Sequence, residues 1–175
     1  MHPRTQELLT FFDSHRAMLK SAFDAVPLER RNQSPEPGRW SAASVVEHLA
    51  IVEGRMAGIL STRIREERDA GLAKETSSDP VLPGIDVTRI SDRSTRVQAP
   101  DFAVPTGIDS SAAWTQLEQS TEALREMLLS GDGLALDKVI QPHSRLGPMS
   151  VYHWIAFLAA HEARHAEQIR EMSGK

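Results

Sequence analysis

Apolar residues recur every three or four positions in four separate stretches of the chain, the spacing that puts them on one face of an α-helix. The stretches cover residues 3–26, 41–71, 109–130 and 150–172. Each is polar on its other side, so each predicts an amphipathic helix that buries one face. No segment shows a convincing strand pattern. We therefore expect an all-α fold, namely a four-helix bundle.

Residues with strong capping or helix-ending preferences stand near the ends of these stretches. Ser41, Asp109 and Ser150 precede three of the stretches and are good N-cap residues. Pro27 follows the first stretch and Gly131 follows the third, where each favours the end of a helix. The boundaries of the predicted helices are thus supported by residues outside the apolar pattern.

The connection between the second and third helices is long and has no helical periodicity. It runs from Leu72 to about Gly107 and contains four prolines. A connection of this length is uncommon in a compact domain, and in a bundle it can return the chain to its starting end. The second and third helices are then expected to run parallel. At 175 residues, the chain is expected to form a single domain, 1–175.

Composition excludes several classes of function. The net charge is −4 and no basic cluster is interleaved with aromatic residues, so we expect no nucleic-acid partner. No apolar run approaches the length of a membrane span and no signal-peptide pattern opens the chain, which favours a cytoplasmic protein without a membrane partner. The chain has no cysteine, so any metal must be held by histidine and carboxylate side chains.

Two histidines lie within the apolar stripe of the last helix. His161 and His165 are four residues apart and share a face with Leu158 and Ile169. Buried imidazoles need partners, and a metal ion is one such partner. The residues expected on the solvated side are Glu162, Arg164, Glu167 and Arg170.

Two further histidines occupy apolar stripes. His48 lies in the second stripe, and taken alone it reads as a core histidine. If the second and fourth helices are neighbours, His48 can meet the histidine pair, and three neutral imidazoles with open positions are typical of a catalytic metal. His15, in the first stripe, is either a further ligand or pocket residue, or a core-edge histidine with a local partner.

Residues 161–165 also match the HExxH pattern of zinc proteases. Such a protease normally has a strand-bearing domain before this helix and a third ligand after it. Only ten residues follow His165. The protease interpretation is therefore less favoured than a metal site of another kind, or than histidines that pair with carboxylates or face a pocket.

Several segments together resemble the DinB-like superfamily of four-helix-bundle metalloenzymes. The matching segments are Trp40-Ser41, residues 46–49, 91–93, 99–100, 105–106, 146–150 and 154–169. The resemblance implies an up-down-down-up bundle. It also implies one divalent metal, most often nickel or zinc, with iron, cobalt or manganese as further options. Transferred to this chain, the implied ligands are His48, His161 and His165.

The resemblance also implies an activity. Members include S-transferases that use the low-molecular-weight thiols bacillithiol or mycothiol, and a mycothiol-dependent maleylpyruvate isomerase; many are dimers. We therefore expect a transferase or hydrolase with a small-molecule substrate, and a homodimer is compatible with it. The alternatives are a non-catalytic metal-binding, stress-response or dimerisation module, and a structural bundle whose histidines are satisfied by Glu or Tyr152.

For three of four other residues near the candidate site, the sequence leaves two interpretations open. His143 either lines the mouth of a pocket or bonds to the backbone of its own loop. Glu47 and Glu162 either orient a metal-bound imidazole or are solvated surface carboxylates. His153 falls off the apolar stripe and is expected to be exposed.

Overall fold

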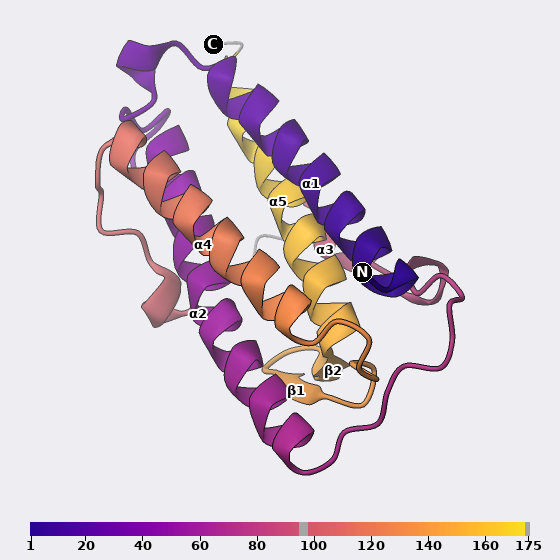
Figure 1. Cartoon of the computed structure of the whole chain (residues 1–175). Coiled ribbons are helices and arrows are strands. Elements are labelled where there is room, and N and C mark those ends of the chain that lie inside the picture. Colours follow the sequence, from indigo (N-terminus) through magenta and orange to yellow (C-terminus); the bar gives the residue numbers. More distant parts are fainter. Residues whose placement is uncertain (95–97, 174–175) are drawn as a thin grey trace.

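Four long helices make up most of the chain in the computed structural model, which describes residues 1–94 and 98–173. They are α1 (Pro3–Asp24), α2 (Ala42–Asp69), α4 (Ser110–Ser130) and α5 (Val151–Ser173) (Figure 1). The shorter elements are α3 (Thr88–Ser91), 3₁₀ turns at Leu28–Arg30, Leu82–Gly84 and Asp101–Ala103, and strands β1 (Ile140–His143) and β2 (Gly147–Ser150). Within these described ranges, no helix is long and apolar enough to cross a membrane.

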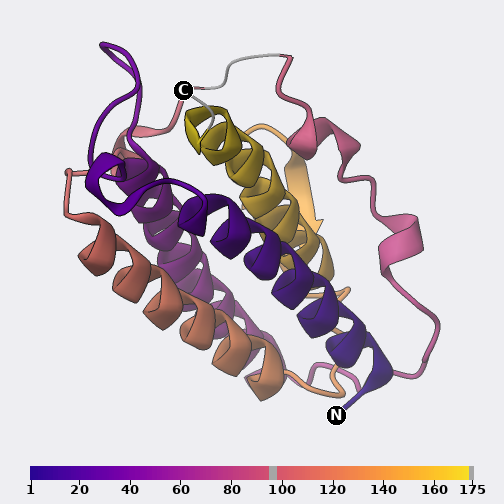
Figure 2. The ribbon, with the colours of Figure 1, turned by 90° about the horizontal axis from the view of Figure 1, so that it is seen from above.

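The four long helices form a bundle, as expected, in which α2 and α4 run in one direction and α1 and α5 in the other (Figure 1). The most extensive helix–helix contacts join α2 to α4 and α1 to α5. The connection 72–107 runs outside the helices, from the end of α2 back to the start of α4 (Figures 1 and 2). The parallel pair α2 and α4 therefore follows from the long crossover.

The helices begin where capping residues are available. The side chain of Ser41 accepts a hydrogen bond from the backbone N–H of Ser44, and that of Asp109 accepts from the N–H groups of Ser111 and Ala112. These contacts satisfy N–H groups that the first turn of a helix leaves without partners. The N-caps predicted at Ser41 and Asp109 are confirmed.

The apolar side chains of the bundle form two buried clusters. The hairpin-end cluster, next to β1 and β2, includes Leu8, Leu60, Leu128 and Leu158. The far-end cluster, at the opposite end of the helices, includes Leu19, Leu49, Leu117 and Ile169. Each of the four long helices contributes to both clusters, so each helix carries a boundary between them.

One prediction was wrong: the loop before the last helix contains a β-hairpin. Strands β1 and β2 pair antiparallel, with Ile140 opposite Ser150 and Pro142 opposite Pro148. Proline lacks a backbone donor and is disfavoured in strands, which explains why residues 140–150 carry no strand signal. The hairpin supports the start of α5, because the Trp154 indole N–H donates to the backbone oxygen of Gln141 at 2.8 Å.

The crossover is partly structured, and carboxylates near its two ends tie it to the bundle. At its beginning, Glu7 of α1 accepts hydrogen bonds from the backbone N–H groups of Val81 and Leu82. Near its other end, Glu47 of α2 accepts from residues 106–108. Between these ties, α3 packs against α5 and the turn Asp101–Ala103 packs against α2. Residues 95–97 of the predicted crossover lie outside the described part of the structure.

Candidate metal site

The structure brings His48, His161 and His165 together between α2 and α5. One ring nitrogen from each lies within 4.8 Å of the other two. The ring centroid of His48 is 5.3 Å from that of His161 and 5.1 Å from that of His165. The three residues that the resemblance pointed to thus form one cluster, although His48 precedes the other two by more than 100 residues.

Hydrogen bonds at Nδ1 fix the orientation of two of the rings. A carbonyl oxygen can only accept, so Nδ1 of His48 donates to the backbone oxygen of Ala103, at 2.7 Å. Nδ1 of His165 lies 2.9 Å from the amide oxygen of Gln168 and is the donor there by the same reasoning. Each ring then presents an unprotonated Nε2 to the cluster, which is the arrangement that outer partners impose on metal-binding histidines.

His161 is the least satisfied member of the cluster. Its Nε2 lies 3.1 Å from Nε2 of His165, and without an ion one of these two atoms must carry a proton. Among the described residues, Nδ1 of His161 has no hydrogen-bond partner. His161 is also partly exposed, whereas His48 and His165 are buried. Part of the His161 side chain therefore reaches the surface, although its Nδ1 is buried.

Burial keeps the three imidazoles neutral. Burial lowers the pKa of His165 to about 3, with a further contribution from His48. Burial and the neighbouring His165 lower the pKa of His161 well below its ordinary value, and burial also lowers that of His48. A histidine must be neutral to bind a metal, so all three are in the form a metal ligand requires.

The donor set fits a divalent transition metal. Metal–imidazole bonds are about 2.0–2.1 Å long, so two nitrogen ligands on one tetrahedral ion lie roughly 3.3 Å apart. The Nε2 atoms of His161 and His165 are already close to that separation. Three protein nitrogens leave further coordination positions open, as in catalytic sites and unlike structural sites with four protein ligands.

Aromatic rings flank the histidines. Trp40 lies against His48, with ring centroids 4.9 Å apart, and Phe157 stacks on His161 at 5.7 Å. His143, from β1, packs on Phe157 at 4.9 Å. Its Nδ1 accepts from two backbone N–H groups of its own turn, as one of the two interpretations expected. His143 also lies at the edge of the histidine cluster, because the Phe157 ring that it packs on stacks on His161.

The remaining histidines of the long helices lie apart from this group. His15 on α1 bonds through Nδ1 to the backbone oxygen of Phe11 at 2.8 Å, and its ring packs on the ring of that residue. Of the two interpretations of His15, these contacts fit a core-edge histidine with a local partner. His153 is exposed, as expected, and bonds to Ser150 at the start of α5.

Glu47 is buried, which corrects the expectation of a solvated surface carboxylate. Its oxygens accept hydrogen bonds from the hydroxyl and N–H of Thr106 and from the N–H groups of Gly107 and Ile108. Burial tends to raise the pKa of Glu47, but these hydrogen bonds outweigh burial and lower it. The carboxylate thus holds the crossover in place rather than binding an imidazole.

Glu162 is also buried and does not belong to the solvated side of α5, where the periodicity put it. Its carboxylate lies 2.6 Å from the guanidinium of Arg16 on α1 and next to Glu53 of α2. Burial raises the pKa of both glutamates, and for Glu162 the charge of Glu53 adds to the effect. In HExxH proteases this glutamate acts as the base at the metal. Here it contacts Arg16 instead, which argues against that activity.

Sequence reasoning singled out these two glutamates but could not give the direction of their side chains, because their partners are far away in the chain. Arg16 sits beside the apolar stripe of α1 like any surface arginine, and residues 106–108 belong to a segment without periodicity. A charged residue directly before or after a ligand histidine was the available hint. It shows a position near the site but not the direction of the side chain.

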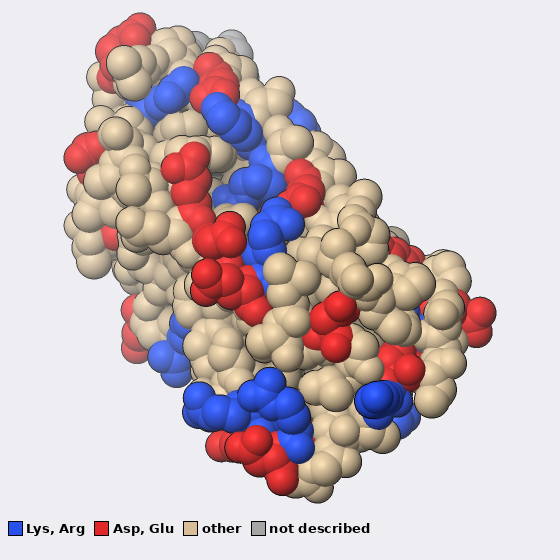
Figure 3. All heavy atoms as spheres, in the orientation of Figure 1, with Lys and Arg blue, Asp and Glu red and all other residues tan. Residues whose placement is uncertain are grey.

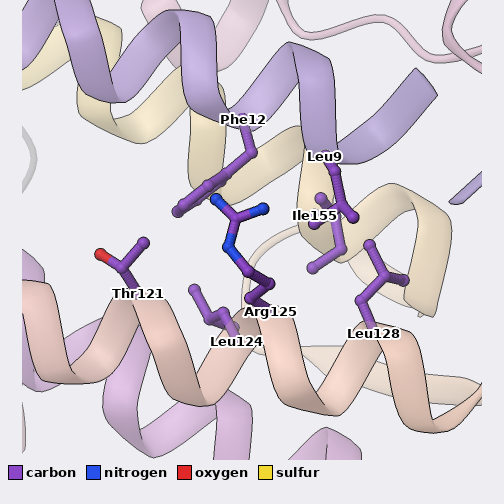
Figure 4. A pocket seen from close by; sticks show the side chains of 7 residues that line it. All are labelled: Leu9, Phe12, Thr121, Leu124, Arg125, Leu128 and Ile155. Carbon is purple, nitrogen blue, oxygen red and sulfur yellow. The ribbon is translucent and has the colours of Figure 1, made fainter. Parts of the chain in front are cut away.

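The cavity drawn in Figure 4 lies between α1, α4 and α5 within the hairpin-end cluster. It holds about 10 Å³ and is lined mainly by apolar side chains such as Phe12 and Leu128, with Arg125 reaching in from α4 (Figure 4). A space of this size accommodates a single water molecule. It is too small to be a substrate site.

The fold and the histidine cluster define a class of small helical-bundle proteins suited to holding a metal between two helices. The chain belongs to the DinB superfamily, whose family model matches residues 12–169. The uncharacterized protein YuaE of Bacillus subtilis (strain 168) is similar, with 24% identity over 170 residues that cover 95% of this chain and 98% of the relative. No solved structure matches the chain. The resemblance seen in the sequence is confirmed at the level of the superfamily.

Proposed function

We propose that the protein is a metal-dependent enzyme that holds one divalent ion, nickel or zinc, on His48, His161 and His165. The bound ion would lower the pKa of a coordinated thiol or water and so supply a nucleophile at neutral pH. The reaction is transfer of a low-molecular-weight thiol to a small electrophilic substrate, or hydrolysis of that substrate. Membership of the DinB superfamily supports the proposal.

The observation that carries the proposal is the convergence of three neutral imidazoles of which one, His161, is partly exposed. Three histidine ligands would leave coordination positions open, which is typical of catalytic rather than structural metal sites. Hydrogen bonds from Nδ1 to Ala103 and Gln168 would hold the rings of His48 and His165 in the ligand orientation.

The chain has no cysteine, so a thiol substrate must come from solution. The approach to His161 is bordered by the rings of Phe157 and His143. An apolar border excludes water from part of the site and favours an electrophile with an apolar body. Nε2 of His143 carries the proton, since Nδ1 accepts from the backbone, and it can donate to a polar group of the substrate.

The test is the metal content of untagged protein purified without chelators, measured by inductively coupled plasma mass spectrometry. We expect about one equivalent in the wild type and almost none in His161→Ala. His153→Gln is the matched control, because it removes an exposed histidine of the same helix and keeps a side chain able to support the N-terminus of α5.

The metal-loaded protein is then assayed with bacillithiol, mycothiol or glutathione and an aryl chloride whose conjugation changes its absorbance, and with activated esters for hydrolysis. Turnover that is lost in His161→Ala supports the enzyme. One equivalent of metal without turnover of any of these probes supports the non-catalytic metal-binding module instead. Wild-type protein that is folded and refuses added nickel and zinc would overturn the metal site altogether.

A further inference from the structure

A layer of polar side chains crosses the middle of the bundle, with one residue from each long helix. The members are Arg16 of α1, Glu53 of α2, Ser120 of α4 and Glu162 of α5. The Arg16 guanidinium lies 2.7 Å from Glu53 and 2.6 Å from Glu162, and the Ser120 hydroxyl is 3.3 Å from Glu53. We call these four residues the polar layer.

The polar layer is buried to an extent that is unusual for charged residues. The Glu53 and Glu162 side chains are 1% and 0% exposed, and that of Arg16 is 15% exposed. By contrast, acidic and basic side chains lie side by side on the surface around α1 and α4 (Figure 3), where pairs such as Arg125 with Asp13 are open to solvent. Surface pairs of that kind contribute little, whereas buried charges depend on their partners.

The polar layer coincides with the boundary between the two apolar clusters on every helix. On α1, Phe12 belongs to the hairpin-end cluster and Leu19 to the far-end cluster, with Arg16 between them. On α5, Ala159 and Ala166 mark the same boundary around Glu162. The placement repeats at Glu53 of α2 and Ser120 of α4.

This placement fixes the axial position of each helix. One helical turn is about 5.4 Å long, so a slip of one turn would move a charged side chain into an apolar cluster and away from its partner. An uncompensated buried charge is strongly unfavourable. An apolar stripe alone tolerates such slips far better, because one leucine can replace another.

Stability does not account for the polar layer. Two glutamates face one guanidinium, burial raises the pKa of both, and within the described residues Nε and Nη1 of Arg16 are buried without a hydrogen-bond partner. A buried network that is only partly satisfied is less favourable than well-packed apolar side chains. The benefit must therefore lie in the arrangement of the helices that the polar layer enforces.

The arrangement concerns the histidine cluster directly. Glu162 lies between His161 and His165 in the sequence, so any rotation or translation of α5 that moves Glu162 moves both histidines. Glu53 follows His48 by five residues on α2. The contacts of Arg16 with both glutamates thus constrain the two histidine-bearing helices at the level of the cluster.

We infer that the polar layer is a positioning device for the metal site, in which Arg16 and Glu162 hold the His161–His165 pair opposite His48 without touching the metal. The inference rests on the proposed function for the identity of the ligand. Glu162, the glutamate of the HExxH pattern, then positions the histidines instead of transferring protons at the metal.

The test replaces the polar layer by apolar side chains of similar volume, in the combined variant Arg16→Met, Glu53→Leu and Glu162→Met. Circular dichroism and thermal unfolding establish that this variant folds. We expect its affinity for zinc, measured by competition with a chromophoric chelator, to fall about 10- to 100-fold, and the visible spectrum of its cobalt form to change. The single variant Arg16→Lys keeps the positive charge and both glutamates. Its affinity for zinc should lie between that of the combined variant and that of the wild type.

Arg125→Met is the matched control, since it removes an arginine that also joins two helices, α1 and α4, through an acidic side chain, Asp13, but is 32% exposed and lies outside the polar layer. It should bind zinc as the wild type does. A folded combined variant with wild-type affinity and an unchanged cobalt spectrum would overturn the inference.

A second readout separates this inference from the proposed function. The imidazole C–H signals of His48, His161 and His165 in the NMR spectrum of metal-free protein should shift in the combined variant and stay in place in Arg125→Met. If the wild type binds no metal but these signals shift, the proposed function fails and the polar layer positions three histidines that hold no metal. If the wild type binds metal and the signals do not shift, the positioning role fails alone.

Discussion

The imidazole of His48 donates a hydrogen bond to the backbone oxygen of Ala103, which lies 55 residues further along the chain. The residue just before it, Glu47, accepts hydrogen bonds from residues 106–108 of the same segment. Two consecutive side chains of α2 therefore hold the end of the crossover. The position of His48 in the candidate metal site and the path of the crossover thus depend on each other.

Glu47→Gln should weaken both the fold and the metal site. The amide group of glutamine has one acceptor oxygen and would turn a donor toward backbone N–H groups that now donate to a carboxylate. We expect a loss of about 1–3 kcal/mol in the free energy of unfolding, measured in urea, because buried donors lose their acceptor. Zinc affinity should fall as well, since His48 loses a fixed acceptor for Nδ1.

Thr106→Val is the comparison for this prediction, because it removes the hydroxyl bond to Glu47 and keeps the three backbone bonds. Its loss should be smaller, about 1 kcal/mol. Equal stabilities of Glu47→Gln and the wild type would show that the carboxylate does not hold the crossover.

Metal should stabilise the protein against heat. A ligand that binds only the folded state at 100 times its dissociation constant adds about 2.7 kcal/mol. For a chain of this length that corresponds to a rise in Tm of roughly 5–10 °C. Scanning calorimetry with zinc or nickel should show the rise in the wild type, reversal by a chelator, and no rise in His165→Ala. An identical rise in that variant would place the bound metal elsewhere.

Arg16→Met alone should be strongly destabilising. It leaves Glu53 and Glu162 buried next to each other without a cation. Removal of one partner from a buried ion pair costs about 3–5 kcal/mol, whereas Arg125→Met at the surface should cost less than about 1 kcal/mol. Urea unfolding of both variants checks the difference, and similar losses in the two would mean that the polar layer is not a buried charge network.

Stability should depend on acid pH through Glu75 of the crossover. Burial tends to raise the pKa of Glu75, but hydrogen bonds from Ser77, Arg4 and Tyr152 outweigh burial and lower it to about 2. A carboxyl whose pKa is lower in the folded state stabilises the protein above its unfolded pKa of 4.5. That contribution is lost as the pH falls from about 4.5 toward about 2.

Glu75→Gln should therefore be less stable than the wild type at pH 7 and should lose less stability across that acid range. Urea unfolding at a series of pH values measures both curves. Parallel curves for the two proteins would show that Glu75 has the same pKa folded and unfolded.

The sequence predicted the helices well because the signal for them is local. The spacing of apolar residues and the caps at Ser41 and Asp109 depend only on near neighbours, and the observed helices agree with the predicted stretches to within about two residues at most ends. The hairpin was missed for an equally local reason, since Pro142 and Pro148 hide a strand pattern that tertiary contacts nevertheless support.

The candidate site was only partly predictable. The pairing of His161 with His165 follows from helical spacing, but the addition of His48 needs the packing of α2 against α5, which came from the resemblance. The direction of Glu162 depends on Arg16, nearly 150 residues earlier. Periodicity counts every charged residue as exposed, so it cannot detect a charge that is buried with a distant partner.

The bonds of Glu7 and Glu47 to the crossover divide that segment into parts with different freedom to change during evolution. Glu7 and Glu47 hold the segment against the bundle, whereas the described residues between them, 83–94 and 98–102, contact the helices through α3, the 3₁₀ turn and the pair of Arg93 with Glu171. Exchanges in that stretch can alter the surface beside α5 while the three histidines stay in place. If the protein is the metal-dependent enzyme proposed above, a lineage of such proteins could change its substrate by substitutions in one loop and keep the same histidine cluster.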